Sequence, residues 1–239
     1  MLAEDRWAEI SGHPLPSVEA RIRTGYDVLG AVPVKTAKDH LLIGPELAGT
    51  LMTVEEFDAA RDWEEGYRYE LIHGVLVVTP PPSAGERGPN DLLGHLLREY
   101  QENHPRGSSL DSTLTEHTVA TPRSRRRADR VVWVGLGRRP DVRRDTPAVV
   151  IEFVSSRRRD RLRDYETKRE EYREAGVAEY WIVDRFRRRL TAVRYSSSPS
   201  ELVVGEKQTY TTELLPGFEL PLERLLAEAD WLTREEMDA

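Results

Sequence analysis

Apolar positions along the chain follow two periods, and together they predict an α/β protein. Short apolar or alternating runs bounded by turn residues predict strands at 129–134, 147–154, 178–184 and 187–195, and a hairpin at 67–78. Apolar positions three and four residues apart predict helices at 89–103, 160–175 and 221–229. A helix separates the strands at 147–154 and 178–184, so we expect these two strands to be parallel. The pattern therefore predicts a mixed sheet flanked by helices.

The two ends of the chain have a weaker pattern. Prolines interrupt residues 1–48, which we expect to form a partly ordered N-terminal extension. Thr53 followed three residues later by Glu56 is a capping-box signature and predicts the start of a short helix. We therefore predict one domain at residues 49–230 and a C-terminal tail at 231–239.

Glu152 is a single carboxylate inside the apolar run PAVVIEFV at residues 147–154. Continuous Val and Ile runs are typical of strands that are buried on both faces. A buried charge without a partner costs several kcal/mol, so such a residue is expected to meet a cation. An arginine, a lysine or a metal ion could each fill that role.

Lys168 is a candidate partner for Glu152. It is one of four lysines in the chain and lies in a segment dense in arginine. Lys168 and Tyr172 share one stripe of the predicted helix at 160–175, whereas Arg169, Glu170 and Glu171 are expected to face mostly outward. The predicted helix runs back over the sheet. The length of strand that follows Glu152 and the length of helix that precedes Lys168 are similar, so the two residues are expected at about the same level. The alternative is a lysine that extends along the helix flank to solvent.

Asp129 opens the predicted strand at 129–134, and it could share a cation with Glu152. Mg²⁺ typically binds one or two carboxylates, several waters and substrate phosphate oxygens, which suits two acids. A metal there would polarise a phosphodiester, and Lys168 would orient the attacking water or stabilise developing charge. The alternative for Asp129 is a turn residue that pairs with one of Arg125, Arg126 or Arg127.

The charge of the chain is strongly uneven. The net charge is -7, yet residues 123–189 hold 21 of the 35 basic and 12 of the 42 acidic residues. This local net charge of +9 indicates a phosphate-binding face, whose best candidates are the basic loops that hold Arg125, Arg126, Arg127, Arg157 and Arg158. The simpler interpretation is a solvated surface of intrahelical ion pairs.

Composition excludes several other classes of protein. The chain has no cysteine, which excludes disulfides and thiolate zinc sites and suits a reducing, cytoplasmic setting. No apolar run approaches the roughly 20 residues that span a bilayer, and the N-terminus does not resemble a secretory signal. The histidines show no metal-ligand spacing, and no P-loop, Rossmann glycine pattern or G-x-S-x-G elbow is present.

Four segments, in this order, resemble the Uma-type family of putative restriction endonucleases, within the PD-(D/E)xK nuclease superfamily. They are YELIHGVL, the strand opened by Asp129, VVIEFVSS and KREEYREAGVAEYWIVD. The similarity covers roughly residues 50–229, so residues 1–48 lie outside it. Ala128 stands where the family usually has proline, and His73 stands where its first hairpin turn has aspartate.

This resemblance implies a restriction-endonuclease-like core and hydrolysis of DNA phosphodiesters with Mg²⁺ or Mn²⁺. It carries Asp129 and Glu152 over as metal ligands, Lys168 as the catalytic lysine and Glu70 as an accessory acid. Many superfamily members have the lysine two residues after the second acid, where this chain has Val154; the family's shift of the lysine to the next helix fits Lys168.

Two alternatives to a DNA-cleaving enzyme follow from the sequence. A nuclease fold can serve as a non-catalytic protein that binds nucleic acid or a partner. The basic segment can also form only ion pairs, with no nucleic acid involved. A homodimer would suit the cutting of both strands of a duplex, although no segment of the sequence specifies one.

Overall fold

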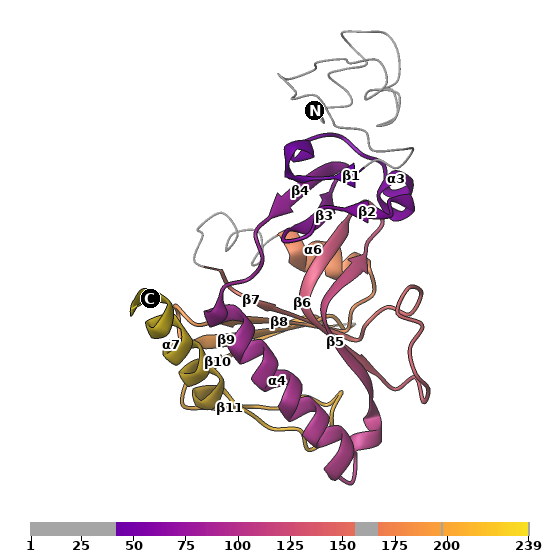
Figure 1. Ribbon diagram of the computed structural model, residues 1–239. Coiled ribbons are helices and arrows are strands. Elements are labelled where there is room, and N and C mark those ends of the chain that lie inside the picture. Colours follow the sequence, from indigo (N-terminus) through magenta and orange to yellow (C-terminus); the bar gives the residue numbers. More distant parts are fainter. Residues whose placement is uncertain (1–41, 156–166, 197, 239) are drawn as a thin grey trace, which may run out of the picture. The chain divides into compact units, whose positions relative to one another are not determined.

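The computed structural model describes residues 42–155, 167–196 and 198–238, so residues 1–41 of the expected N-terminal extension lie outside the described part. The chain divides into two compact units, residues 1–80 and 81–239 (Figure 1). No helix of the described residues is long and apolar enough to cross a bilayer.

The first unit is a small α/β module built around a hairpin. Its elements are β1 (Leu42–Ile43), the 3₁₀ turn η1 (Pro45–Leu47), α3 (Val54–Ala59), β2 (Asp62–Trp63), β3 (Arg68–Ile72) and β4 (Val75–Thr79). The capping box predicted for α3 is confirmed, because Glu56 N–H donates to Thr53 Oγ1 at 3.1 Å and Thr53 N–H donates to Glu56 Oε2 at 2.8 Å. The predicted hairpin turn is confirmed at His73 and Gly74, which both have positive φ (48° and 80°), as a type I′ turn requires.

The second unit contains a mixed sheet. Its elements are α4 (Ala84–Asn103), η2 (Gly107–Ser109), β5 (Leu110–Ala120), β6 (Arg125–Val134), β7 (Val149–Phe153), α6 (Lys168–Glu174), β8 (Glu179–Asp184), β9 (Arg189–Arg194), β10 (Ser200–Gly205), β11 (Thr209–Tyr210), β12 (Leu220–Pro221) and α7 (Leu222–Asp238). Neighbouring strands follow the order β10-β9-β8-β7-β6, and β5 also pairs with β6. β7 and β8 are parallel, as predicted, while the other pairs in this order are antiparallel.

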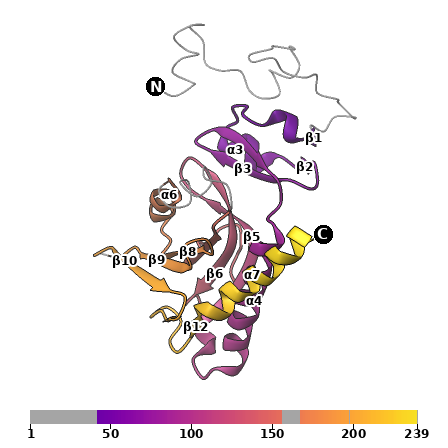
Figure 2. The same cartoon turned by 90° about the vertical axis from the view of Figure 1, so that its left-hand side faces the viewer.

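Helices cover both faces of this sheet, which confirms the predicted fold class. α4 and α7 contact each other and pack on one face, while α6 packs on the other (Figure 2). Alternation along β7 sends Val149, Ile151 and Phe153 toward α4 and α7, and Val150 and Val154 toward the α6 side. Glu152 lies between Val150 and Val154 in this alternation, so its carboxylate faces α6.

Helix α6 ends at Glu174, within one residue of the end predicted for the helix at 160–175. Gly176 has a φ of 84°, and the N–H groups of Gly176 and Val177 donate to the carbonyls of Arg173 and Tyr172. This is the Schellman arrangement, in which the left-handed residue is most often glycine.

Several predicted boundaries were wrong. The expected basic loop at 124–127 is mostly strand, since β6 begins at Arg125, and its run of arginines hid the alternation of buried and exposed positions. α4 begins at Ala84, where Ser83 and Glu86 form a second capping box. α7 continues to Asp238 and so includes most of the segment expected to be a tail.

Candidate active site

Two acids from neighbouring strands lie close together in the second unit. The antiparallel ladder ends at the pair of Arg130 of β6 with Ile151 of β7, and Asp129 and Glu152 are the next residues along the two strands. The charge of Asp129 acts on the carboxyl group of Glu152, which indicates that the two side chains are close. Asp129 is 5% exposed and Glu152 is 2% exposed, so both carboxyl groups are withdrawn from bulk water.

Helix α6 supplies the cation and a hydroxyl that meet Glu152. Lys168 Nζ lies 2.8 Å from Glu152 Oε1, and the hydroxyl of Tyr172 donates to the same oxygen at 2.7 Å. Lys168 is 3% exposed, so the ion pair is buried. Both contacts fall on the same carboxylate oxygen, Oε1. Lys168 and Tyr172 are four residues apart and therefore share one face of the helix.

The carboxylate of Asp129 is oriented by the backbone of the next strand. Phe153 N–H donates to Asp129 Oδ2 at 2.7 Å, a contact made where the ladder between β6 and β7 has ended. The carbonyl of Asp129 in turn accepts from Asn90 Nδ2 of α4 at 2.9 Å. Both the side chain and the main chain of Asp129 are thus fixed by hydrogen bonds.

Arg130 extends this support on the opposite face of the sheet. Its guanidinium donates to Asn90 Oδ1 at 2.7 Å, to the Asn90 carbonyl at 2.8 Å and to Thr113 Oγ1 at 3.1 Å. It lies against Gly94 of α4, where an added Cβ would approach its Nη2 to 2.5 Å. Burial lowers the pKa of Arg130 to about 10, so the group is still charged at neutral pH.

Burial dominates the electrostatics of Glu152. Removal from water raises the pKa of its carboxyl group, the neighbouring charge of Asp129 raises it further, and Lys168 opposes both effects. Two buried acids and one buried lysine thus act on one another at this point of the sheet. An additional cation would stabilise the ionised form of both acids.

A second buried ion pair under α6 was not predicted. Glu171 accepts from Arg126 Nε of β6 and from Ser124 Oγ, the latter at 2.8 Å. The expectation that Glu171 faces outward was wrong, because its position next to Tyr172 brings it onto the buried face. Arg126 is 0% exposed, which is inconsistent with a surface contact to a phosphate backbone.

Arg125 and Arg127 of β6 contact residues outside this cluster. Arg125 is half-buried and donates to the carbonyls of Thr121 and Ser124, and Arg127 pairs with Glu116. Arg157 and Arg158 lie outside the described residues. Glu70 is buried on β3 of the first unit, and its part as an accessory acid stays a prediction.

The donor set fits a hard divalent cation. In the described part of the chain, no group of three or more His, Cys, Asp and Glu side chains could hold a metal ion. Asp129 and Glu152 offer two carboxylates, and Mg²⁺ is commonly held by one or two carboxylates with waters and substrate phosphates completing its shell. Zinc and other metals that need three or four protein ligands do not suit this pair.

A fold of this kind is also found in a solved structure. The chain is similar to the crystal structure of a putative nuclease belonging to DUF820 from Anabaena variabilis, with a TM-score of 0.57, 13% identity, and coverage of 74% of this chain and 99% of the other. At this identity the similarity concerns the fold. No curated protein matches the chain.

The protein thus has an α/β fold that it shares with a putative nuclease. The chain belongs to the Uma2 family, described as putative restriction endonucleases, whose family model matches residues 54–223. The family predicted from the sequence motifs is therefore confirmed.

Proposed function

We propose that the protein is a divalent-metal-dependent endonuclease that hydrolyses DNA phosphodiester bonds. The observation that carries the proposal is the buried contact of 2.8 Å between Lys168 Nζ and Glu152 Oε1, made close to Asp129. A structural ion pair would not need a second buried acid at the same point, because that acid adds repulsion and desolvation cost.

Asp129 and Glu152 would hold the ion, which is Mg²⁺ or Mn²⁺. When bound, the ion polarises the scissile phosphate and lowers the pKa of a water molecule. The hydrogen bond from Phe153 N–H keeps the Asp129 carboxylate oriented, and Tyr172 does the same for Glu152. Pre-oriented groups of this kind lower the reorganisation needed during the reaction.

We assign to Lys168 the role of contacting the attacking water and the reacting phosphate. Its ammonium group is placed by the four-residue spacing from Tyr172 and by the ion pair with Glu152. A buried ammonium donates hydrogen bonds to an attacking water and stabilises negative charge that develops on the phosphate oxygens. Substrate binding would share this donor between Glu152 and the phosphate.

DNA would be attracted by the basic segment at 123–189. Arg125 and Arg127 keep part of their side chains accessible, and Arg157 and Arg158 stay predicted contacts. Glu70 remains the proposed accessory acid. Phosphate contacts of this kind make binding fall steeply with salt concentration.

Cleavage of supercoiled plasmid tests the proposal. We expect nicked or linear products with Mg²⁺ or Mn²⁺ and none in EDTA, because the ion completes the site. DNA binding that is indifferent to EDTA, with no cleavage in either metal, would instead support a non-catalytic binding protein on this fold.

A further inference from the structure

The turn between β8 and β9, residues 185–188, exposes an aromatic ring among arginines. Its sequence is Arg-Phe-Arg-Arg, and Arg189 follows at the start of β9. The Phe186 residue is 46% exposed, and the side chain of Arg187 is 58% exposed. The guanidinium carbon of Arg185 lies 4.8 Å from the centroid of the Phe186 ring, within the range of a cation–π contact.

This turn is held rigidly. The buried carboxylate of Asp184 accepts the N–H groups of Phe186 at 3.0 Å and of Arg187 at 2.9 Å. Arg188, with a φ of 53°, pairs with Glu206 and with Asp230 of α7, and its carbonyl accepts from Glu206 N–H. Phe186 is therefore presented to solvent on a fixed backbone, which lowers the entropy cost of binding a flat ligand.

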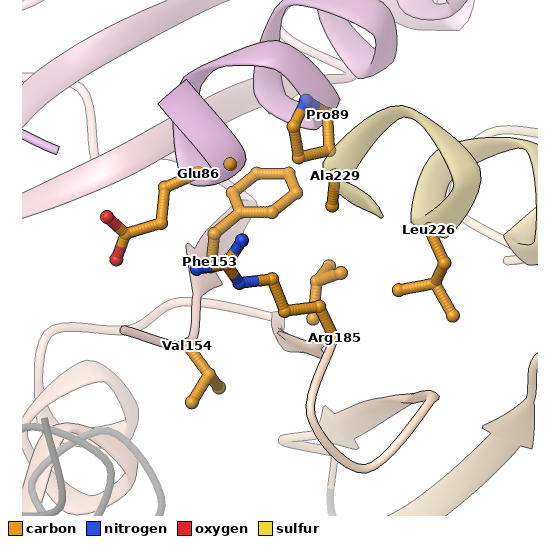
Figure 3. A pocket seen from close by; sticks show the side chains of 9 residues that line it. Glu86, Pro89, Phe153, Val154, Arg185, Leu226 and Ala229 are labelled. Carbon is orange, nitrogen blue, oxygen red and sulfur yellow. The ribbon is translucent and has the colours of Figure 1, made fainter. Parts of the chain in front are cut away.

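The turn begins at the same edge of the sheet as the candidate active site. The parallel register pairs Glu152 with Ile182 and Phe153 with Val183, so Phe186 lies four residues beyond the level of Glu152. That is at most about 13 Å along the strand direction, or roughly four nucleotides of a DNA strand. The Arg185 side chain reaches across the carboxyl end of β7 and helps to line a hollow with Phe153 and Val154 (Figure 3).

We propose that residues 185–188 bind the substrate strand, with Phe186 stacked on an unpaired base near the cleaved phosphate. An exposed aromatic ring backed by a guanidinium offers a flat face that any base can cover, and Arg187 adds a cation for the adjoining phosphate. The inference rests on the proposed function for the identity of the ligand, DNA, and adds a base contact that the acids and Lys168 do not provide.

Binding of a fluorescent single-stranded DNA oligonucleotide, measured by anisotropy with Ca²⁺ in place of Mg²⁺, tests the stacking. We expect Phe186→Ala to weaken binding about 5- to 150-fold, since one stacked base contributes about 1–3 kcal/mol. Phe186→Trp, which keeps a larger ring, should stay within about threefold of the unmodified protein. Leu202→Ala, a control at a comparably exposed apolar residue on β10, should bind as the unmodified protein does.

An oligonucleotide of abasic nucleotides separates base stacking from phosphate attraction. The unmodified protein should bind the abasic oligonucleotide more weakly than normal DNA, by the same factor by which Phe186→Ala weakens binding to normal DNA. Phe186→Ala should bind the two oligonucleotides with equal affinity. Three results would overturn the inference. They are unchanged DNA affinity of Phe186→Ala, a reduction of its affinity relative to the unmodified protein that is equal on both oligonucleotides, or no DNA binding by the unmodified protein.

Plasmid cleavage in parallel distinguishes this failure from that of the proposed function. Metal-dependent cleavage by the unmodified protein, together with unchanged DNA binding by Phe186→Ala, would contradict the stacking and support the nuclease activity. Weaker binding by Phe186→Ala, without any cleavage by the unmodified protein, would support the stacking and contradict the nuclease activity.

Discussion

Glu152→Gln is expected to lower metal-dependent plasmid cleavage at least about a thousandfold. The amide keeps the shape of the side chain but removes the charge that would hold the ion, and loss of several kcal/mol of transition-state stabilisation gives a factor of this size. It also removes the ionic partner of Lys168, whose ammonium lies 2.8 Å from Oε1. The measurement is the initial rate of plasmid nicking in Mg²⁺.

Glu201→Gln is the matched control for this variant. Glu201 is an exposed glutamate on β10 that pairs with Arg169 of α6, the helix that carries Lys168. Its variant should therefore cleave at the normal rate. Thermal melting of both variants would show that the fold is kept. Cleavage by Glu152→Gln at the rate of the unmodified protein would remove Glu152 from the mechanism.

Glu171→Ala is expected to lower the free energy of unfolding by about 3–5 kcal/mol. The substitution leaves the guanidinium of Arg126 buried without its carboxylate, and this is the costly way to break a buried pair. Within the described residues, Nη1 and Nη2 of Arg126 already lack hydrogen-bond partners, so no second acceptor there compensates. Urea unfolding curves measure the change.

The neighbouring residue on the same helix supplies the control. Glu170 pairs with Arg173 at the surface, so Glu170→Ala should leave the unfolding midpoint almost unchanged. Replacing both members of the buried pair, as Arg126→Met with Glu171→Met, should recover most of the stability because no buried charge remains. Equal, small shifts of the unfolding midpoint for Glu170→Ala and Glu171→Ala would contradict the stabilising role of the buried pair between Arg126 and Glu171.

The main secondary structure and the position of Glu152 could be predicted because both depend on local periodicity. The apolar run at 147–154 and its one acid are visible in the sequence, and the helix that follows fixes the parallel pairing of β7 and β8. The phase of that helix placed Lys168 on the face that contacts Glu152. These inferences needed only strand and helix geometry.

The partners of the site could not be predicted, because each joins segments distant in sequence. Glu171 looked like a surface residue of a charged helix until its partner was known, and that partner, Arg126, lay in a run of arginines with no visible alternation. The contact of Asn90 with Asp129 and Arg130 has no local pattern. Gly94 gave a partial signal, because a glycine inside a helix often marks a close approach.

Melting temperature as a function of metal concentration tests the central claim most directly. If Asp129 and Glu152 share one divalent ion, Mg²⁺ or Mn²⁺ should stabilise the unmodified protein, by about 2.7 kcal/mol at a hundred times the dissociation constant. Asp129→Asn should lose this stabilisation while keeping its fold. An equal metal-induced shift in both proteins, or none in the unmodified protein, would contradict the account.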